Sequence, residues 1–153
     1  MYQIAVLALT LVIGIAVGAM AQGGGVRHLN PSTLSTPAGY THVVMPSPGG
    51  RLVFIAGQVS ADKSGAVVGK VDFRAQAKQV FDYLKLAVEA AGGGVSDIAK
   101  INIYVTDMSQ INTIREVRQQ YFKSSPPAST LVQVVNLARP EYMLEIEAIA
   151  VVK

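Results

Sequence analysis

The segment LEIEAIA near the end of the chain carries the residues best suited to chemistry. Glu145 and Glu147 stand two positions apart in it, so in a strand their side chains point to the same face. A carboxylate held in a cleft can orient or deprotonate a water molecule, and burial there can raise its pKa. The alternative is that both glutamates lie on one solvated strand face.

Serine, threonine and histidine offer fewer candidates. Ser129 and Thr130 could form a nucleophile pair, but no base stands near them in the sequence, so contact with a polar ligand is the preferred interpretation. His28 and His42 are too few for a histidine-rich metal centre or a Ser-His-Asp triad. The chain has no cysteine, which excludes a disulfide scaffold and a thiolate zinc site. No metal site is expected.

The overall charge gives little support for nucleic-acid binding. The 153 residues include 13 Lys or Arg and 10 Asp or Glu, a formal net charge of +3, and the basic residues are scattered instead of clustered. A chain of this length supports one compact domain.

The first 21 residues predict a targeting segment. Residues 4–21 are apolar or small, with Thr10 as the single polar side chain, and they end in Ala19-Met20-Ala21, a pattern typical of signal-peptide cleavage. The sequence therefore predicts an exported protein, periplasmic or secreted. The alternative is an uncleaved membrane anchor formed by residues 4–21. A flexible linker and loop follow at residues 22–38, and the folded domain is expected at residues 39–153.

Hydrophobic periodicity in that domain predicts two helices and five strands. Asp72 is a plausible N-cap for a long helix that ends at Gly92, and a shorter helix over residues 111–122 ends before Pro126 and Pro127. The predicted strands cover residues 41–45, 52–59, 98–106, 130–137 and 143–152.

The order β-β-α-β-α-β-β favours an α+β fold, a mixed sheet with both helices packed on one face. The other sheet face also carries many apolar residues, which indicates that it packs against a partner.

Several segments in this order resemble the RidA/YjgF (Rid) superfamily over residues 39–153. They are VFIAGQVSAD at residues 53–62, the helix at residues 75–92, IYVTD at residues 103–107, Pro127-Ala128, and LEIEAIA at residues 144–150. The resemblance implies a chorismate-mutase-like fold and a homotrimer, in which the sheets form an inner barrel and three clefts lie between subunits.

The resemblance also implies an activity, the hydrolysis of reactive 2-imino acids or their enamine tautomers to 2-keto acids and ammonia. No metal or cofactor takes part. In that chemistry an arginine holds the substrate carboxylate as a bidentate pair, and a glutamate positions the attacking water.

The family's functional residues transfer only in part. Glu145 matches the water-orienting glutamate and is the candidate catalytic residue, Tyr40 matches a tyrosine at the cleft mouth, and Gly57 matches the glycine that lines it. Where the family has its carboxylate-binding arginine, this chain has Ser129.

The residues after Ser129 and one position in the second helix also bear on the substrate. Thr130 and Leu131 follow Ser129, and Leu131 replaces a residue whose backbone contacts the ligand. An asparagine position is Arg115 here. Because a serine cannot replace a guanidinium, Arg115 or Arg139 must supply the cation if simple 2-imino acids are to bind. The alternative for each is a solvated surface arginine.

Two functions from different classes follow. The first is an exported trimeric hydrolase of imine or enamine-type small molecules with an altered substrate. The second is a non-catalytic trimeric protein that binds a small molecule and has lost the carboxylate clamp. Ribonuclease activity has little support, because the sequence has no basic patch. No membrane contact is expected unless residues 4–21 are retained.

Overall fold

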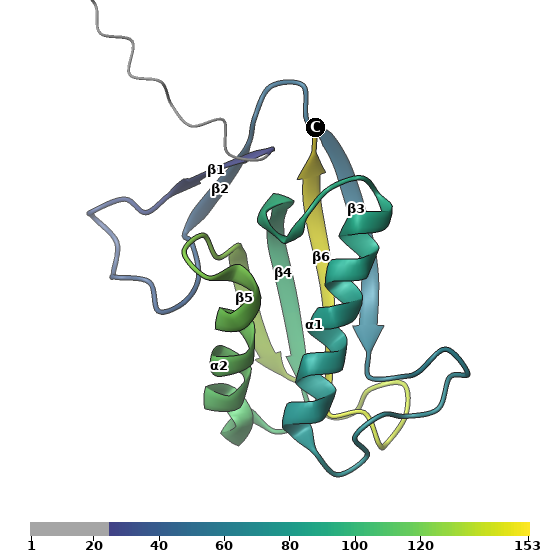
Figure 1. The fold of residues 1–153 in the computed structure, drawn as a ribbon. Helices are drawn as coiled ribbons and strands as arrows, with labels where there is room; N and C mark the ends of the chain where they lie inside the picture. Colours follow the sequence, from purple (N-terminus) through teal and green to yellow (C-terminus); the bar gives the residue numbers. More distant parts are fainter. Residues whose placement is uncertain (1–24) are drawn as a thin grey trace, which may run out of the picture.

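A computed structural model describes residues 25–153 of the chain (Figure 1). The predicted signal segment lies outside the described residues. The strands are β1 (Val26–Leu29), β2 (Val43–Pro46), β3 (Arg51–Val59), β4 (Ile98–Val105), β5 (Ala128–Gln133) and β6 (Leu144–Val152). The helices are α1 (Phe73–Ala90) and α2 (Ile111–Phe122), with short 3-10 turns η1 (Val95–Asp97) and η2 (Met108–Gln110) before β4 and α2. Within residues 25–153, no helix is both long and apolar enough to cross a membrane.

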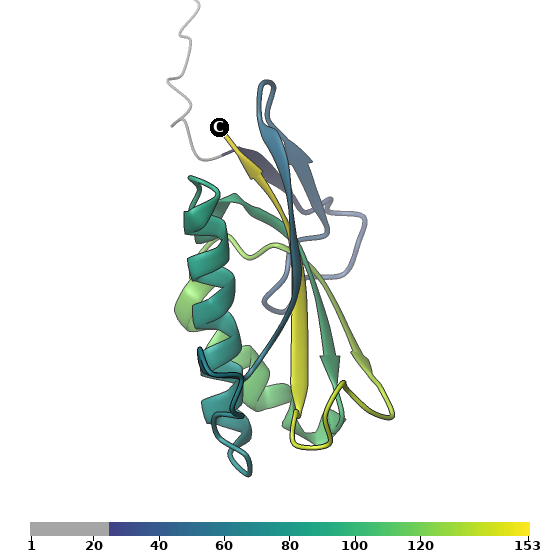
Figure 2. The same cartoon turned by 90° about the vertical axis from the view of Figure 1, so that its right-hand side faces the viewer.

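Four strands form a mixed sheet in the order β3-β6-β4-β5. The pairs β3/β6 and β4/β6 are antiparallel, whereas the edge strand β5 runs parallel to β4. Both helices cover the same face of this sheet and leave the other face open (Figure 2). The predicted α+β architecture with two helices on one face is confirmed.

The core lies between the helices and the sheet, because strand alternation and helix periodicity bring their apolar stripes together. Ile101, Ile103 and Ile146 are fully buried against Phe81 and Leu84 of α1. The ends of α1 also follow the predicted signals. Asp72 accepts a hydrogen bond from the backbone N–H of Ala75 at 3.0 Å, and Gly92 adopts a positive φ of 85° just beyond the helix.

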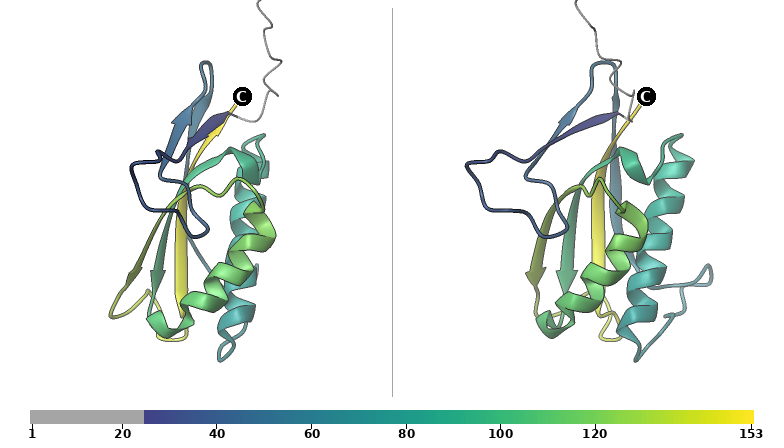
Figure 3. Two further views of the ribbon diagram at one scale, coloured as in Figure 1. Left: turned by 90° about the vertical axis from the view of Figure 1, so that its left-hand side faces the viewer. Right: turned by 60° about the vertical axis from the view of Figure 1, so that its left-hand side comes forward.

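The segment before residue 39 differs from the predicted flexible linker. Val26–Leu29 pairs with Val43–Pro46 as a two-stranded antiparallel ribbon, which lies beyond the sheet face opposite the helices (Figure 3). The backbone N–H of Gly25 donates to Asp97 Oδ1 at 3.0 Å, and Gly25 packs so closely on the Val151 carbonyl that a Cβ would collide with it. The residues of β1, VRHL, do not alternate between apolar and polar, so the sequence did not reveal this strand.

The loop between β1 and β2 passes along the edge strand β5 and reaches α2 (Figure 3). Thr41, which is almost fully buried, holds it there: its backbone N–H donates to the Pro127 carbonyl at 3.1 Å, and its hydroxyl donates to the Pro126 carbonyl. This attachment fixes residues 38–40 beside α2, where they contribute to the site described below.

Gln76 connects α1 to two loops at the opposite end of the sheet. Its side chain is fully buried, donates to the carbonyls of Gly69 and Glu141 at 3.1 and 2.7 Å, and accepts from the N–H of Met143 at 2.9 Å. The residues that lead into β6 are therefore positioned by one amide.

Replacing that amide by an apolar side chain tests its role. Gln76→Leu removes three hydrogen bonds of a fully buried amide and leaves three partly buried backbone groups unpaired, so we expect the free energy of unfolding to fall by about 2–4 kcal/mol in urea titrations. Gln120→Leu, at an exposed position of α2, is the control and should change it by less than about 0.5 kcal/mol. Equal effects of the two substitutions on the free energy of unfolding would contradict the role of Gln76 in holding these loops.

Candidate functional site

A hollow of about 190 Å³ lies between α2, the start of β5 and the loop before β2. It is lined by Ala38, Tyr40, Ile111, Arg115, Arg118, Ser129 and Leu131. Four of the predicted site residues therefore meet in one place, although they come from three separate segments of the chain. Arg115, which the sequence offered as a replacement cation, is one of them.

Arg118 is the residue of this hollow that sequence reasoning missed. Its side chain is only 6% exposed, and its nearest polar contacts are long: Nη1 to Ser129 Oγ at 3.4 Å and Nη2 to the Ala38 carbonyl at 3.5 Å. No carboxylate within residues 25–153 forms an ion pair with it. Burial, together with the nearby charge of Arg115, lowers the pKa of Arg118, although a guanidinium stays protonated in proteins.

Helical spacing held a signal for this residue. Arg118 stands four positions after Ile114 and four before Phe122, both buried, so it belongs to the stripe of α2 that faces the core. Burying an unpaired cation destabilises a fold. A charged side chain on that stripe therefore indicates a role other than stability, such as binding an anion.

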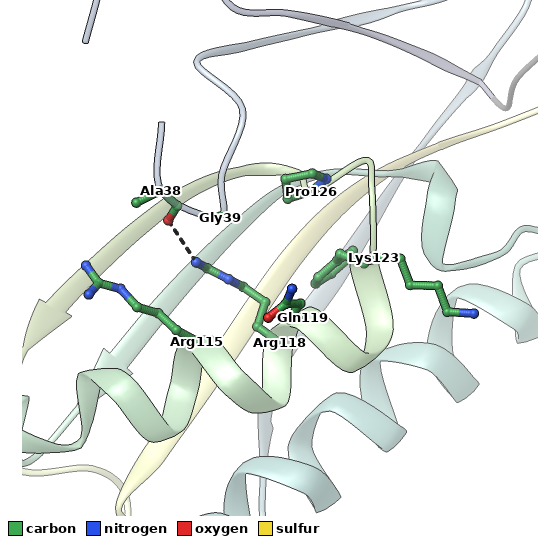
Figure 4. Close-up of a pocket in the computed structure, with 8 residues that line it drawn as sticks. Ala38, Gly39, Arg115, Arg118, Gln119, Lys123 and Pro126 are labelled. Carbon is green, nitrogen blue, oxygen red and sulfur yellow. Dashed lines mark hydrogen bonds between the residues drawn. The ribbon is translucent and has the colours of Figure 1, made fainter. Parts of the chain in front are cut away.

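A second hollow of about 280 Å³ adjoins the first on the far side of Arg118. Ala38, Arg115 and Arg118 line both, and Gln119, Phe122, Lys123, Pro126 and Gly39 complete the second. Arg115 and Arg118 rise from the same side of α2, and the tip of Arg118 meets the Ala38 carbonyl, whereas the Lys123 ammonium points away (Figure 4). The charge at this place therefore comes from the two arginines.

The candidate catalytic glutamate lies elsewhere, on the open face of the sheet. A shallow depression of about 400 Å³ there is lined by Tyr104, Val134, Asn136, Leu137, Ala138, Glu145 and Glu147. Glu147 Oε1 accepts hydrogen bonds from Asn102 Nδ2 at 2.8 Å and Tyr104 Oη at 2.9 Å. These bonds lower the pKa of Glu147, and the bond to Glu147 raises the pKa of Tyr104.

Glu145 differs from Glu147 in its surroundings. Among residues 25–153 no side chain donates a hydrogen bond to its carboxylate, which leaves both oxygens free for water. Gly57 makes room for it, because β3 is irregular between Ile55 and Gln58, and a Cβ at position 57 would lie 2.8 Å from Glu145 Cδ. The predicted pair of Gly57 and Glu145 is therefore brought together by the structure.

Two predicted binding residues lie outside the hollow beside α2. Thr130 points to the open face of the sheet, where its hydroxyl accepts a hydrogen bond from Lys100 Nζ. Arg139 donates to the Gly65 carbonyl at 3.0 Å and its guanidinium lies 5.9 Å from the centre of the Tyr142 ring. Arg139 thus holds the turn before β6 to the loop after β3. Of the two arginines predicted as replacement cations, Arg115 is the one that lies in the hollow.

One chain does not bring the arginines and the glutamate to one ligand. Ser129 pairs with Ile101 of β4, whereas Glu145 pairs with Tyr104, three residues further along the strand, or about 10 Å. Ile101 faces the helices, and Tyr104 faces the open side. Each chain therefore carries two candidate half-sites, one cationic and one with a free carboxylate. Within residues 25–153 no group of three His, Asp or Glu side chains could hold a metal ion.

Comparison with known proteins shows the family of this chain. Residues 31–152 match the family model described as endoribonuclease L-PSP. A RutC family protein of Pyrococcus horikoshii is 38% identical over 101 residues, which cover 66% of this chain and 79% of the relative. The chain belongs to the RidA/YjgF superfamily.

Solved structures of the family share the fold. A protein of the conserved Rid family, YyfB of Yersinia pestis, superposes with a TM-score of 0.78 at 33% identity, covering 84% of this chain and 99% of that one. RidA of an Antarctic Psychrobacter species gives a TM-score of 0.62 at 32% identity over 77% of this chain and 92% of its own. TdcF of E. coli, solved with bound serine, superposes with a TM-score of 0.62 at 35% identity, covering 70% of this chain and 84% of that one.

The burial of Arg118 without an acidic partner makes a prediction about stability. Arg118→Met keeps an unbranched apolar stem and removes the buried charge, so we expect the free energy of unfolding to stay unchanged or rise by about 1–2 kcal/mol. Arg115→Met, at an exposed position, should change it by less than about 0.5 kcal/mol. Urea titration measures both. A loss of more than 1 kcal/mol on Arg118→Met would show that the guanidinium supports the fold instead of a ligand.

Proposed function

We propose that this Rid-family protein hydrolyses imine or enamine-type small acids in clefts between the subunits of a homotrimer. The observation that carries the proposal is the guanidinium of Arg118, buried without an acid and in contact with Ser129. Ser129 stands where the family resemblance expects the carboxylate-binding arginine, so Arg118 delivers a cation to that place from α2 instead of from β5.

The division of the half-sites suggests how the reaction proceeds. The substrate carboxylate pairs with Arg118 of one chain, which holds the imine carbon toward the open sheet face of a neighbouring chain. There Glu145 orients a water molecule and accepts its proton as the water oxygen bonds to that carbon. Glu145 passes this proton to the imine nitrogen, which gives a carbinolamine. Glu145 then accepts the proton of the new hydroxyl and delivers it to the nitrogen as the carbon–nitrogen bond breaks, so that a keto acid and ammonia leave.

The trimer itself is supported by the open face of the sheet. Leu52 and Phe54 of β3 and Val132 of β5 are 58%, 73% and 40% exposed there, and no element of residues 25–153 covers them. An apolar patch of this kind is typical of a surface that packs against another chain. Homotrimers are typical of the family, and in such a trimer these faces form the inner barrel.

Ribonuclease activity, after which the matching family model is named, has less support in the residues. The His42 ring bonds to the Ser35 carbonyl at 2.8 Å, and the His28 ring bonds to Thr41 Oγ1 at 3.2 Å. Both histidines therefore hold the β1–β2 segment in place. Neither lines the hollow beside α2 or the depression that holds Glu145.

A location outside the cytoplasm, periplasmic or secreted, remains part of the proposal. It is supported by the uncharged, apolar residues 1–21 and the sequence Ala19-Met20-Ala21. Fractionation of cells that express the full-length protein tests it, and recovery of the protein from the cytoplasmic fraction alone would contradict it.

Substitution of the proposed catalytic carboxylate separates a hydrolase from a binding protein. With imines generated in situ by an amino-acid oxidase, Glu145→Gln should lower the rate of ammonia release by about 10²–10⁴-fold, because the amide cannot accept the proton of water. Binding of the keto-acid product should persist. Glu141→Gln, at an exposed turn position before β6, is the matched control and should keep the wild-type rate.

The outcomes are distinct. Ammonia release that survives in Glu145→Gln would remove Glu145 from the mechanism. Product binding by the wild-type protein with no acceleration of ammonia release would favour the alternative function, a trimeric protein that binds a small molecule without transforming it.

A further inference from the structure

Two guanidinium groups without an acidic partner stand side by side at the cationic half-site. Arg115 and Arg118 are three positions apart in α2 and therefore share one side of the helix. Both line the hollow with Ser129 and the adjoining hollow with Gln119, and no Asp or Glu lines either. The nearest acid along α2, Glu116, pairs with Arg74 of α1. The half-site thus holds two positive charges that neighbouring residues do not neutralise.

We propose that this pair selects acids with two carboxylates, one for each guanidinium. The substrates would then be imines or enamines of dicarboxylic amino acids. The inference rests on the proposed function for the reaction and adds the substrate class.

The charges of the two arginines argue for a doubly charged ligand. A single carboxylate pairs with one guanidinium through two hydrogen bonds. If it binds Arg118, the positive charge of Arg115 remains beside it, and that charge already acts on the Arg118 guanidinium, whose pKa it helps to lower. A second carboxylate neutralises Arg115 and removes the repulsion between the two side chains.

The shape of the half-site argues for two separate carboxylates over one compact phosphate. Arg118 is buried, whereas Arg115 is exposed, so the two cations lie at different depths. Their stems leave α2 next to each other and end in separate guanidinium groups that do not converge on one point (Figure 4). Hollows of about 190 and 280 Å³ on the two sides of Arg118 leave room for a chain of several carbons.

Calorimetric titration with keto-acid products tests the inference. The probes are 2-oxoglutarate, which has two carboxylates, and 2-oxopentanoate, which has the same carbon chain with one. The wild-type protein should bind 2-oxoglutarate about fivefold more tightly, as expected for an added ion pair with an exposed arginine. Arg115→Gln should bring the two affinities within about twofold, and Arg118→Gln should weaken both by roughly tenfold or more.

A matched control removes one positive charge elsewhere. Arg51 is exposed at the start of β3, the opposite edge strand of the sheet, near Gly92 at the end of α1. Arg51→Gln should leave the affinities for both keto acids unchanged. A loss of selectivity in this variant would show that net charge, and not the pair on α2, determines the preference.

Three results would overturn the substrate class: equal affinities for the two keto acids, a preference that survives in Arg115→Gln, or inorganic phosphate that competes as strongly as 2-oxoglutarate. Ammonia release from the corresponding imines is measured in parallel. Release without a preference for the dicarboxylic imine refutes the substrate class alone. A preference for 2-oxoglutarate without any ammonia release refutes the hydrolase and leaves the ligand class standing.

Discussion

The site depends on one buried charge. Arg118 lies on the stripe of α2 that packs toward the sheet. Within residues 25–153 its guanidinium forms hydrogen bonds to neutral oxygens alone, the Ser129 hydroxyl and the Ala38 carbonyl. Taking a cation out of water without an acidic partner destabilises a fold unless a ligand supplies the missing charge. The β1–β2 segment, fixed through Thr41 to the residues before β5, closes the hollow around this group. The loop between β1 and β2 therefore forms a wall of the site through Ala38, Gly39 and Tyr40.

Sheet geometry separates that charge from the carboxylate of Glu145, its proposed partner in the reaction. Ser129 and Glu145 stand at different registers of β4 and on different faces of the sheet. Gly57 keeps Glu145 accessible at one end of the open face, while Gln76 positions the chain that leads into β6. In the proposed trimer another chain covers the apolar residues on the same open face. The same association that buries Phe54 can place one subunit's arginines opposite another subunit's glutamate.

The sequence predicted the elements that have a long apolar period and missed the strand β1. The long apolar periods of α1 and β6 predicted the α+β fold and its helix-covered face, whereas the four residues of β1 carried no usable period. The site was predicted in part. Tyr40, Arg115, Ser129 and Leu131 line the hollow beside α2, and Glu145 lines the depression on the open face, next to Gly57. Thr130 faces away from the hollow, since neighbouring strand residues alternate sides, and Arg139 binds a loop. Arg118 was missed because a charged helical residue is usually solvated, and only its spacing from Ile114 and Phe122 indicated burial.

Mixed assemblies test most directly whether each cleft takes its arginine and its glutamate from different chains. Arg118→Met and Glu145→Gln chains are each assayed alone for ammonia release from imines, then unfolded together, refolded as a mixture and assayed again. Each variant alone should be nearly inactive. Random mixing in equal amounts should restore about a quarter of the wild-type activity, because a quarter of the interfaces then join an intact Arg118 to an intact Glu145. Mixed trimers that form and stay as inactive as the separate variants would contradict a site shared between subunits.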